Sequence, residues 1–317
     1  MELDPFLFSD EAVSEETREF NRELQEILRS MPTTHTQTPQ GVRDKRRRGG
    51  PPWGPVVHSD HAREVPIKGP GGDLVLRIID VGDSDGVYLH LHGGGWVLGA
   101  ADLSDVGNEA MVREAGVTVV SVDYRLAPEH PYPAAIDDCS TAARWLIENA
   151  ANEFGTDKLT IGGESAGATL AAATLLRVRD ETGYTAWRGA NLVYGVYMLP
   201  ASPSVRAWET DGLVLDRETM EWFGHHYVGE PRPDPSDQYF SPLFGDLSNM
   251  PPALFTIGTW DPLVDDTLFM ATRWAVSGNE TDLAIYPGGV HAFDGFPTTI
   301  GLEARRRMHE FIRRACE

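Results

Sequence analysis

The chain has 317 residues, 41% of them hydrophobic, and a formal net charge of -21 at pH 7. A chain of this length and composition can bury one large core, so we expect one catalytic domain with a cap. The strong negative charge argues against attraction to nucleic acid or to an anionic membrane surface.

Residues 1–60 are predicted to form an N-terminal cap helix and a mobile loop. The first residues show no basic region followed by an apolar one, and the longest apolar run, around 170–176, is too short to span a bilayer. Both features predict a cytoplasmic protein without membrane insertion. Helical periodicity covers residues 11–31, and its possible N-cap is Ser9 or Asp10.

The segment from residue 33 to residue 55 is polar and rich in Gly and Pro, which predicts an extended or mobile loop. It contains a basic run at residues 43–48. Such a run can bind nucleic acid, but in a strongly acidic chain we interpret it as part of a solvated loop.

From residue 61 onward, predicted strands and helices alternate, and we expect residues 61–317 to be the catalytic domain. The strands are predicted at 63–68, 74–81, 87–91, 117–122, 159–161, 253–257 and 281–286. The helices are predicted at 104–115, 134–152, 166–180, 265–277 and 302–316. This alternation predicts an α/β fold with a mostly parallel, doubly wound sheet. An insertion at about 202–235 interrupts it and predicts a helical cap, although its apolar residues would also fit the packing face of one amphipathic helix.

Two short motifs carry the predicted chemistry. Residues 163–167 read Gly-Glu-Ser-Ala-Gly directly after a predicted strand, a pattern in which the glycines leave room for a serine nucleophile, Ser165, on a tight turn. Residues 92–95 read His-Gly-Gly-Gly, where the missing side chains let backbone N–H groups face a developing oxyanion. The predicted oxyanion hole consists of Gly93, Gly94, Gly95 and Ala166, with Gly93 mainly permitting the sharp bend.

A serine nucleophile needs a base, and the base needs a carboxylate that fixes its tautomer. Asp261 and His291 each follow a late predicted strand, in the order Ser, Asp, His. We therefore predict that Ser165, His291 and Asp261 form a catalytic triad. Asp261 could instead be only the N-cap of the next helix, and His291 could be a loop histidine without a role. The competing carboxylates, Asp265 and Asp266, are expected to point away, one turn down that helix.

A metal or cofactor is not expected. His90 and His92 share one face of a strand, as metal ligands can, but no third ligand has a fitting spacing. The two cysteines, Cys139 and Cys316, are far apart and have no Cys-x-x-Cys spacing, which argues against a zinc site and a structural disulfide.

Taken in order, these motifs resemble the hormone-sensitive-lipase group of bacterial and archaeal carboxylesterases in the α/β-hydrolase superfamily. The matching segments are 92–96, 123–129, 163–167, 241–243, 261–263 and 291–293. The resemblance covers about residue 60 to the end and, more loosely, the N-terminal helix. One departure is Glu164, where this group most often has Asp.

The resemblance implies an α/β-hydrolase fold and assigns the 123–129 segment a structural role. It also implies that the N-terminal helix and the insertion form a cap over the pocket, and that the C-terminal helix and last strand form a homodimer. The candidate substrate-binding residues are Trp53, Trp96, Trp222, Phe223 and Tyr227.

The predicted function is a serine carboxylesterase that hydrolyses a small-molecule ester through an acyl-enzyme intermediate. The same triad could hydrolyse activated amides, carbamates or lactones. A non-catalytic receptor on this scaffold, such as the plant gibberellin receptor, lacks the catalytic histidine, whereas His291 is present here. Aromatic cap residues predict a short, closed pocket that prefers acyl chains of about two to six carbons.

Overall fold

The computed structural model describes residues 3–80, 82, 84–209 and 213–317. In this part of the chain, eight strands form one sheet in the order β1-β2-β4-β3-β5-β6-β7-β8. Their bounds are β1 Ala62–Gly69, β2 Gly72–Ile79, β3 Gly86–Leu91, β4 Val117–Asp123, β5 Leu159–Glu164, β6 Gly189–Val193, β7 Ala253–Trp260 and β8 Thr281–Val290. Only β1 with β2 and β2 with β4 pair antiparallel, which confirms the predicted mostly parallel α/β sheet.

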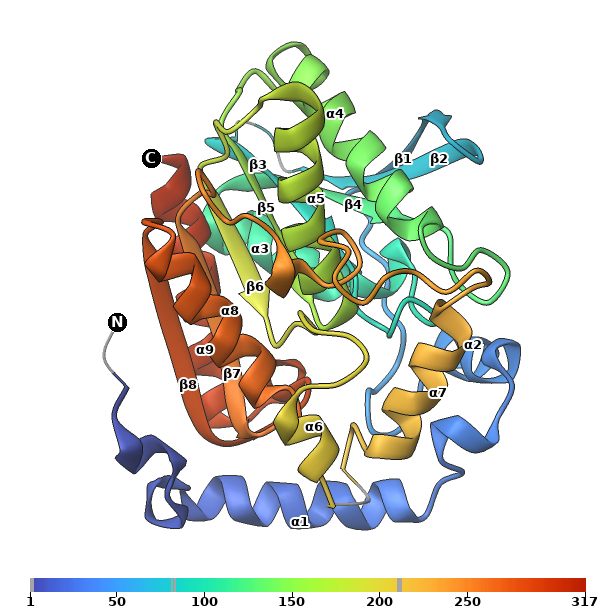
Figure 1. The fold of residues 1–317 in the computed structure, drawn as a ribbon, viewed down its shortest axis with the longest axis vertical. Helices are drawn as coiled ribbons and strands as arrows, with labels where there is room; N and C mark the ends of the chain where they lie inside the picture. Colours follow the sequence, from blue (N-terminus) through green and yellow to red (C-terminus); the bar gives the residue numbers. More distant parts are fainter. Residues whose placement is uncertain (1–2, 81, 83, 210–212) are drawn as a thin grey trace.

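Helices cover both faces of the sheet (Figure 1). Their bounds are α3 Asp105–Ala115, α4 Ala134–Phe154, α5 Ala166–Thr182, α8 Val264–Val276 and α9 Thr299–Cys316. α4 packs against α5, and α3 packs against α9. Every residue of β3 is buried, because a central strand of a parallel sheet faces helices on both sides. The mostly apolar sequence of β3, with His90 as the exception, therefore follows from its position.

One strand was not predicted from the sequence. β6 has the sequence Gly-Ala-Asn-Leu-Val, and three of its five residues are poor strand formers. Its neighbours β5 and β7 supply the hydrogen bonds that hold it in the sheet. The predicted strand at 74–81 begins earlier, at Gly72, and its last position, Val81, lies outside the described residues.

The N-terminal helix, α1 (Glu15–Arg29), begins later than predicted. Its N-cap is Ser14, whose Oγ accepts the N–H of Thr17 at 3.1 Å, whereas Asp10 starts a short 3-10 helix, η2 (Asp10–Ala12). Asn21 on α1 donates from Nδ2 to the carbonyl of Gly288 at 2.8 Å, which fastens the helix to the end of β8.

The predicted mobile loop at 33–55 contains a helix, so that prediction was wrong. α2 (Pro39–Arg48) is capped by Thr38, whose Oγ1 accepts the N–H of Gly41 at 3.2 Å, and it ends at Gly49 with φ of 70°. Val42 is its one buried residue, so hydrophobic periodicity could not reveal it. Its last turn holds four basic residues of the 43–48 run, at an end where the helix dipole favours cations: Lys45, Arg46, Arg47 and Arg48.

The insertion at 202–235 forms two helices, α6 (Pro203–Ala207) and α7 (Arg217–Tyr227), and residues 210–212 within it lie outside the described part. α1, α2, α6 and α7 gather at the end of the sheet to which the arrow of β6 points (Figure 1). Parallel strands deliver their functional loops to that end.

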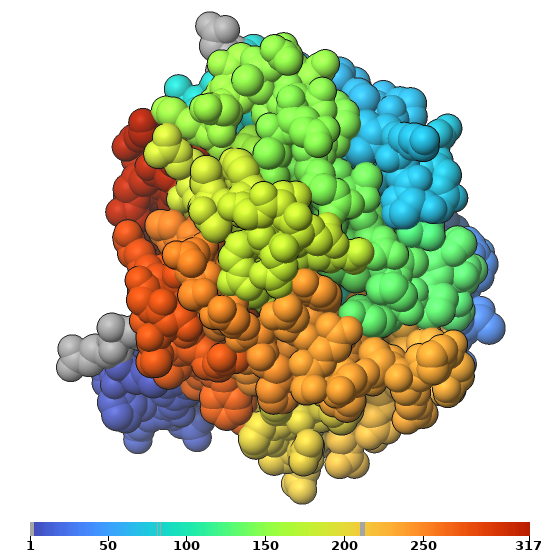
Figure 2. All heavy atoms as spheres, turned by 45° about the horizontal axis from the view of Figure 1, so that its top comes forward, coloured from blue at the N-terminus to red at the C-terminus, as the bar shows by residue number. Residues whose placement is uncertain are grey.

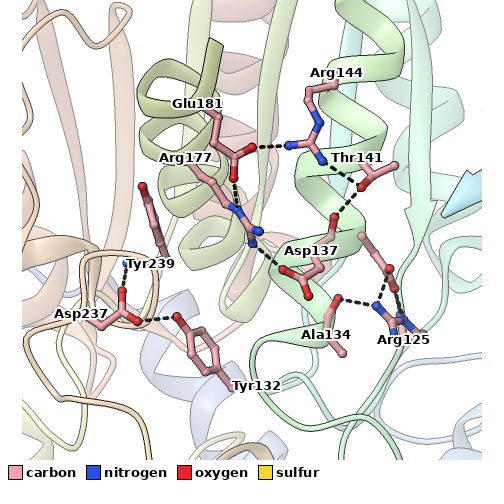
Figure 3. Close-up of polar contacts among 11 residues, drawn as sticks. Arg125, Tyr132, Ala134, Asp137, Thr141, Arg144, Arg177, Glu181, Asp237 and Tyr239 are labelled. Atoms are coloured by element: carbon pink, nitrogen blue, oxygen red, sulfur yellow. Dashed lines mark hydrogen bonds and ion pairs between the residues drawn. The ribbon is translucent and has the colours of Figure 1, made fainter. Parts of the chain in front are cut away.

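Polar contacts hold the segment after α7 against the main fold (Figure 3). The Tyr132 hydroxyl donates to Asp237 at 2.8 Å, and the Tyr239 hydroxyl donates to Asp180 on α5 at 3.0 Å. Beside them, Arg177 joins α5 to Asp137 on α4 at 2.5 Å. In Figure 2 the surfaces of α4 and α5 continue into the orange surface of the chain that follows α7. Partly exposed pairs of this kind add little stability singly, but together they set where the segment lies.

Both cysteines are buried free thiols. Within the described ranges, we find no helix of sufficient length and hydropathy to cross a lipid bilayer.

Candidate active site

Ser165 occupies the tight turn between β5 and α5, with φ of 56° and ψ of -120°. A non-glycine residue rarely adopts a positive φ, and such strain is typical of functional positions. The two flanking glycines allow the turn, because a Cβ atom on Gly163 or on Gly167 would lie 1.9 Å from the carbonyl oxygen of Leu91. β3 and the turn can therefore approach closely, and the serine is presented at the sheet's edge.

The structure brings the three predicted triad residues into one chain of hydrogen bonds. The His291 Nδ1 lies 2.8 Å from Asp261 Oδ2, and its Nε2 lies 3.0 Å from Ser165 Oγ. An ionised carboxylate only accepts, so Nδ1 carries the proton and Nε2 is left to accept the proton of the serine hydroxyl. Asp261 is fully buried and follows β7, whereas His291 follows β8.

The alternative interpretation of Asp261 was wrong, because the N-cap of α8 is Leu263. The second oxygen of Asp261, Oδ1, accepts the N–H of Leu263 at 2.9 Å, at the start of α8. This bond fixes the carboxylate while Oδ2 faces His291.

The competing carboxylates bind elsewhere. Asp265 accepts the N–H of Ser204 at 2.8 Å, and Asp266 accepts the N–H groups of Tyr197 and Met198 at 2.8 and 2.9 Å. Burial raises the pKa of Asp266 to about 6. Asp266 thus holds the segment between β6 and α6, and Asp265 holds the first turn of α6. Neither carboxylate is bonded to His291.

The His-Gly-Gly-Gly segment forms a sharp turn after β3. Gly94 and Gly95 have φ of 119° and 60°, and the N–H of Leu98 donates to the carbonyl of Gly94 at 2.8 Å. Within the described ranges, the N–H groups of Gly94 and Gly95 have no backbone acceptor. Ala166 is the first residue of α5, where helical N–H groups also have no intrahelical partner. Gly93 permits the bend, since a Cβ there would lie 2.8 Å from the carbonyl of Glu164.

Ser165 and His291 line a cavity of about 1710 Å³. This volume contradicts the expected short, closed pocket, because the cavity continues between the insertion, α2 and the chain around Trp53. Trp96 and Phe223 line it, as expected. The Phe223 ring packs directly on the oxyanion turn, where a Cβ on Gly95 would lie 2.2 Å from it.

Two other expected substrate contacts, Trp222 and Tyr227, do not line this cavity. Tyr227 is buried and stacks on Trp96, with ring centroids 4.2 Å apart, so Trp96 separates it from the cavity. Trp222 packs edge-on against Phe223, with ring centroids 5.3 Å apart. Both residues support the lining residues from behind.

The two histidines considered as metal ligands have other partners. His90 Nε2 lies 3.2 Å from Glu164, and its Nδ1 lies 2.9 Å from the Ser121 hydroxyl. His92 stacks on Tyr124, with ring centroids 4.1 Å apart, and burial lowers its pKa to about 4. His92 is therefore neutral near pH 7, as part of the packing beneath the oxyanion turn.

The 123–129 segment braces this turn, as the resemblance implies. The Tyr124 hydroxyl donates to the carbonyl of His92 at 2.7 Å, and the N–H of Ala127 donates to the carbonyl of Trp96 at 2.9 Å.

Sequence reasoning missed a pair beside His291. The Tyr194 ring lies 4.7 Å from the imidazole, between centroids, and its hydroxyl donates to Asp294 at 2.6 Å. Tyr194 follows the unpredicted strand β6 and has φ of 37°. The only indication of this pair in the sequence is that Asp294 lies three residues after His291, and this spacing does not identify Tyr194 as its partner.

The chain is similar to known proteins that have the α/β-hydrolase fold. A family model described as alpha/beta hydrolase fold matches residues 88–295. The chain is 33% identical to the carboxylic ester hydrolase LipN of Mycobacterium tuberculosis over 76% of this chain and 66% of LipN. It is 37% identical to the ethyl acetate hydrolase of Pseudomonas putida over 65% of each protein. The chain thus spans just under two thirds of the length of these two relatives.

Two further proteins are matched over more of their length. The carboxylesterase NlhH of Mycobacterium tuberculosis is 36% identical over 74% of this chain and 75% of its own. The solved structure of an esterase from Pyrobaculum calidifontis is similar with a TM-score of 0.81 at 30% identity, over 92% of this chain and 97% of that one. The chain belongs to the hormone-sensitive-lipase-like family of carboxylesterases, which has the α/β-hydrolase fold.

Proposed function

We propose that this protein is a serine carboxylesterase with Ser165, His291 and Asp261 as its triad. The observation that carries the proposal is the hydrogen-bonded chain from Ser165 Oγ through His291 to the buried Asp261 carboxylate. The names of the relatives, carboxylic ester hydrolase and ethyl acetate hydrolase, favour esters over amides, carbamates or lactones. The intact triad geometry likewise favours an enzyme over a receptor.

The first half-reaction forms an acyl-enzyme. Ser165 Oγ attacks the ester carbonyl carbon while His291 Nε2 takes the hydroxyl proton, and Asp261 stabilises the resulting imidazolium. The N–H groups of Gly94, Gly95 and Ala166 stabilise the oxyanion, which is usually the largest contribution in acyl transfer. His291 then gives its proton to the leaving alcohol oxygen as the bond from carbon to that oxygen breaks.

The second half-reaction releases the acid. A water molecule gives a proton to His291 Nε2 as its oxygen attacks the acyl carbon, and the proton returns to Ser165 Oγ when the carboxylic acid leaves. The described residues supply each of these proton transfers.

A covalent probe tests this proposal. A fluorophosphonate should add one mass to the intact protein, on the peptide that contains residues 163–167, and it should abolish hydrolysis of p-nitrophenyl acetate. Labelling of another peptide, or activity that survives complete labelling, would disprove the assignment of Ser165.

A preference for short neutral acyl groups is part of the proposal, although the cavity of about 1710 Å³ has room for longer ones. Phe223 packs on Gly95 beside Ser165, and Ethyl acetate hydrolase is among the named relatives. Truncating Phe223 to alanine should shift the acyl optimum from about two to six carbons toward longer chains, because each further methylene contributes only about 0.8 kcal/mol until it meets the wall. The measurement is kcat/KM across a p-nitrophenyl ester series.

Trp222→Ala is the matched control for Phe223→Ala. It removes a neighbouring aromatic ring that lies outside the cavity lining, so its shift should be smaller. An optimum that stays in place in Phe223→Ala, together with activation by emulsified long-chain triglyceride, would contradict the proposed acyl wall.

The proposal also covers the cap, the location and the assembly. α1, α2, α6 and α7 serve as the cap, and the protein is cytoplasmic. A homodimer through β8 and α9 is supported by the position of β8 at the edge of the sheet and by Leu302, which is 55% exposed on α9. Size-exclusion chromatography with light scattering tests the dimer.

A further inference from the structure

The basic residues of α2 differ in what their side chains contact. Arg43 and Arg47 fasten the helix to the catalytic domain. Arg43 donates to both carboxylate oxygens of Glu129 at 2.8 Å and to the carbonyls of Val97 and Ala127 at 2.8 and 2.6 Å. Arg47 reaches Asp102 at 3.4 Å. These contacts set α2 beside the oxyanion turn.

Lys45 and Arg46 have a different position, because both line the cavity that contains Ser165. In the ranges that the structure describes, neither side chain has a hydrogen bond or an ion pair. Arg46 is half-buried, and burial lowers its pKa with no neighbouring carboxylate to oppose the effect. A guanidinium that has lost water without gaining an acceptor costs free energy, which an anionic ligand would recover.

The helix dipole does not account for this placement. It favours cations anywhere in the last turn of α2, including Arg48, which is exposed and does not line the cavity. Acidic residues line the cavity too. Glu164, Asp294 and Asp266 are held by His90, by Tyr194 and by backbone N–H groups, whereas Asp216, Glu221 and Glu230 lie in or beside α7, across the cavity lining from α2. Arg46 and Lys45 therefore form a cationic wall with free donors.

The order of strands indicates which part of a substrate faces this wall. Ser165 follows β5, His291 follows β8 on one side, and the oxyanion turn follows β3 on the other. The leaving alcohol must lie beside His291 to receive its proton. α2 is fastened to Val97 and Ala127 on the β3 side. The acyl group is thus the part that extends toward Arg46.

We propose that Arg46, assisted by Lys45, binds a carboxylate at the far end of the acyl group, so that monoesters of dicarboxylic acids are a preferred substrate class. This inference rests on the proposed esterase function and deepens it. The planar guanidinium suits both oxygens of a carboxylate. A dicarboxylate substrate also explains the size of the cavity, because about 1710 Å³ is more than a short neutral acyl group requires.

The test compares pairs of substrates that differ only in charge. The mono-p-nitrophenyl esters of adipic, pimelic and suberic acid are each compared with the p-nitrophenyl ester whose far end is the neutral carboxamide. Wild-type protein should prefer the acid of at least one pair. Arg46→Gln should lower that ratio of kcat/KM about tenfold, as expected for a hydrogen bond to a charged group. Arg46→Lys, which keeps the charge but not the planar donors, should retain part of the preference for the acid over the amide.

Arg48→Gln is the matched control, because it removes the same charge from the same helix outside the cavity. Its ratio should stay within about twofold of wild type. Equal rates on acid and amide at all three lengths, or an unchanged ratio in Arg46→Gln with a native circular dichroism spectrum, would overturn the proposal.

A binding measurement separates this inference from the proposed function. Adipate and suberate should bind wild-type protein in calorimetry and bind Arg46→Gln about tenfold more weakly. If p-nitrophenyl hexanoate is not hydrolysed at all, the esterase proposal fails, while the loss of dicarboxylate binding in Arg46→Gln still supports the anion site. Equal dicarboxylate binding by wild-type protein and Arg46→Gln would disprove the anion site.

Discussion

Replacing Ser165 or His291 with alanine is expected to lower kcat for p-nitrophenyl acetate by about 10⁴- to 10⁶-fold, and the double variant should be no worse than either single one. The reason is that the nucleophile and its base act as one unit: without His291 the hydroxyl keeps its proton, and without Ser165 the base has no nucleophile to activate. The residual rate would come from the oxyanion N–H groups and from binding. Initial rates under matched conditions measure the effect.

Ser236→Ala and His61→Ala serve as controls for this result. Ser236 is exposed after α7, and His61 is exposed just before β1; neither lines the cavity. Both should keep nearly wild-type kcat. A His291→Ala protein that retained substantial activity would show that another base serves Ser165, and additive losses in the double variant would show that the two side chains act separately.

Asp261→Asn is expected to lower kcat by about 10⁴-fold, because the amide can donate to His291 and so favour the wrong imidazole tautomer. Asp265→Asn and Asp266→Asn are the controls, since these carboxylates instead accept backbone N–H groups in the first turn of α6 and in the segment before it. Both should retain kcat far better than Asp261→Asn. A larger loss in Asp266→Asn than in Asp261→Asn would show that the partner of His291 was misassigned.

Asp266→Asn is also expected to raise the thermal stability of the protein in a pH-dependent way. The folded-state pKa of Asp266, about 6, lies above the ordinary value of 3.8, so the ionised carboxylate opposes folding. Its destabilising effect grows as the pH rises from about 4 to about 6 and persists above that range. Asparagine removes the charge and keeps an oxygen for the two N–H groups. The melting temperature of the variant should therefore exceed that of wild type by more at about pH 8 than at about pH 4.

The motifs around Ser165, Asp261 and His291 were predictable because each is local. A serine between two glycines after a buried strand determines its own tight turn, and the ends of parallel strands meet at one edge of the sheet. The order of the three residues along the chain was therefore enough to predict that they meet. The mostly parallel sheet followed in the same way from alternating patterns, since a buried strand such as β3 is mostly apolar.

What only the tertiary structure decided depends on contacts between residues far apart in sequence. α2 has almost no apolar face, and its place comes from Arg43 reaching the 97–129 region. β6 forms because its neighbours supply hydrogen bonds, and with it comes Tyr194 beside His291. Likewise, the spacing of aromatic residues in α7 could not separate Phe223, which faces the cavity, from Tyr227, which Trp96 covers. Periodicity assigns a side chain to a helix face, but only the packed neighbours determine whether that face meets substrate or protein.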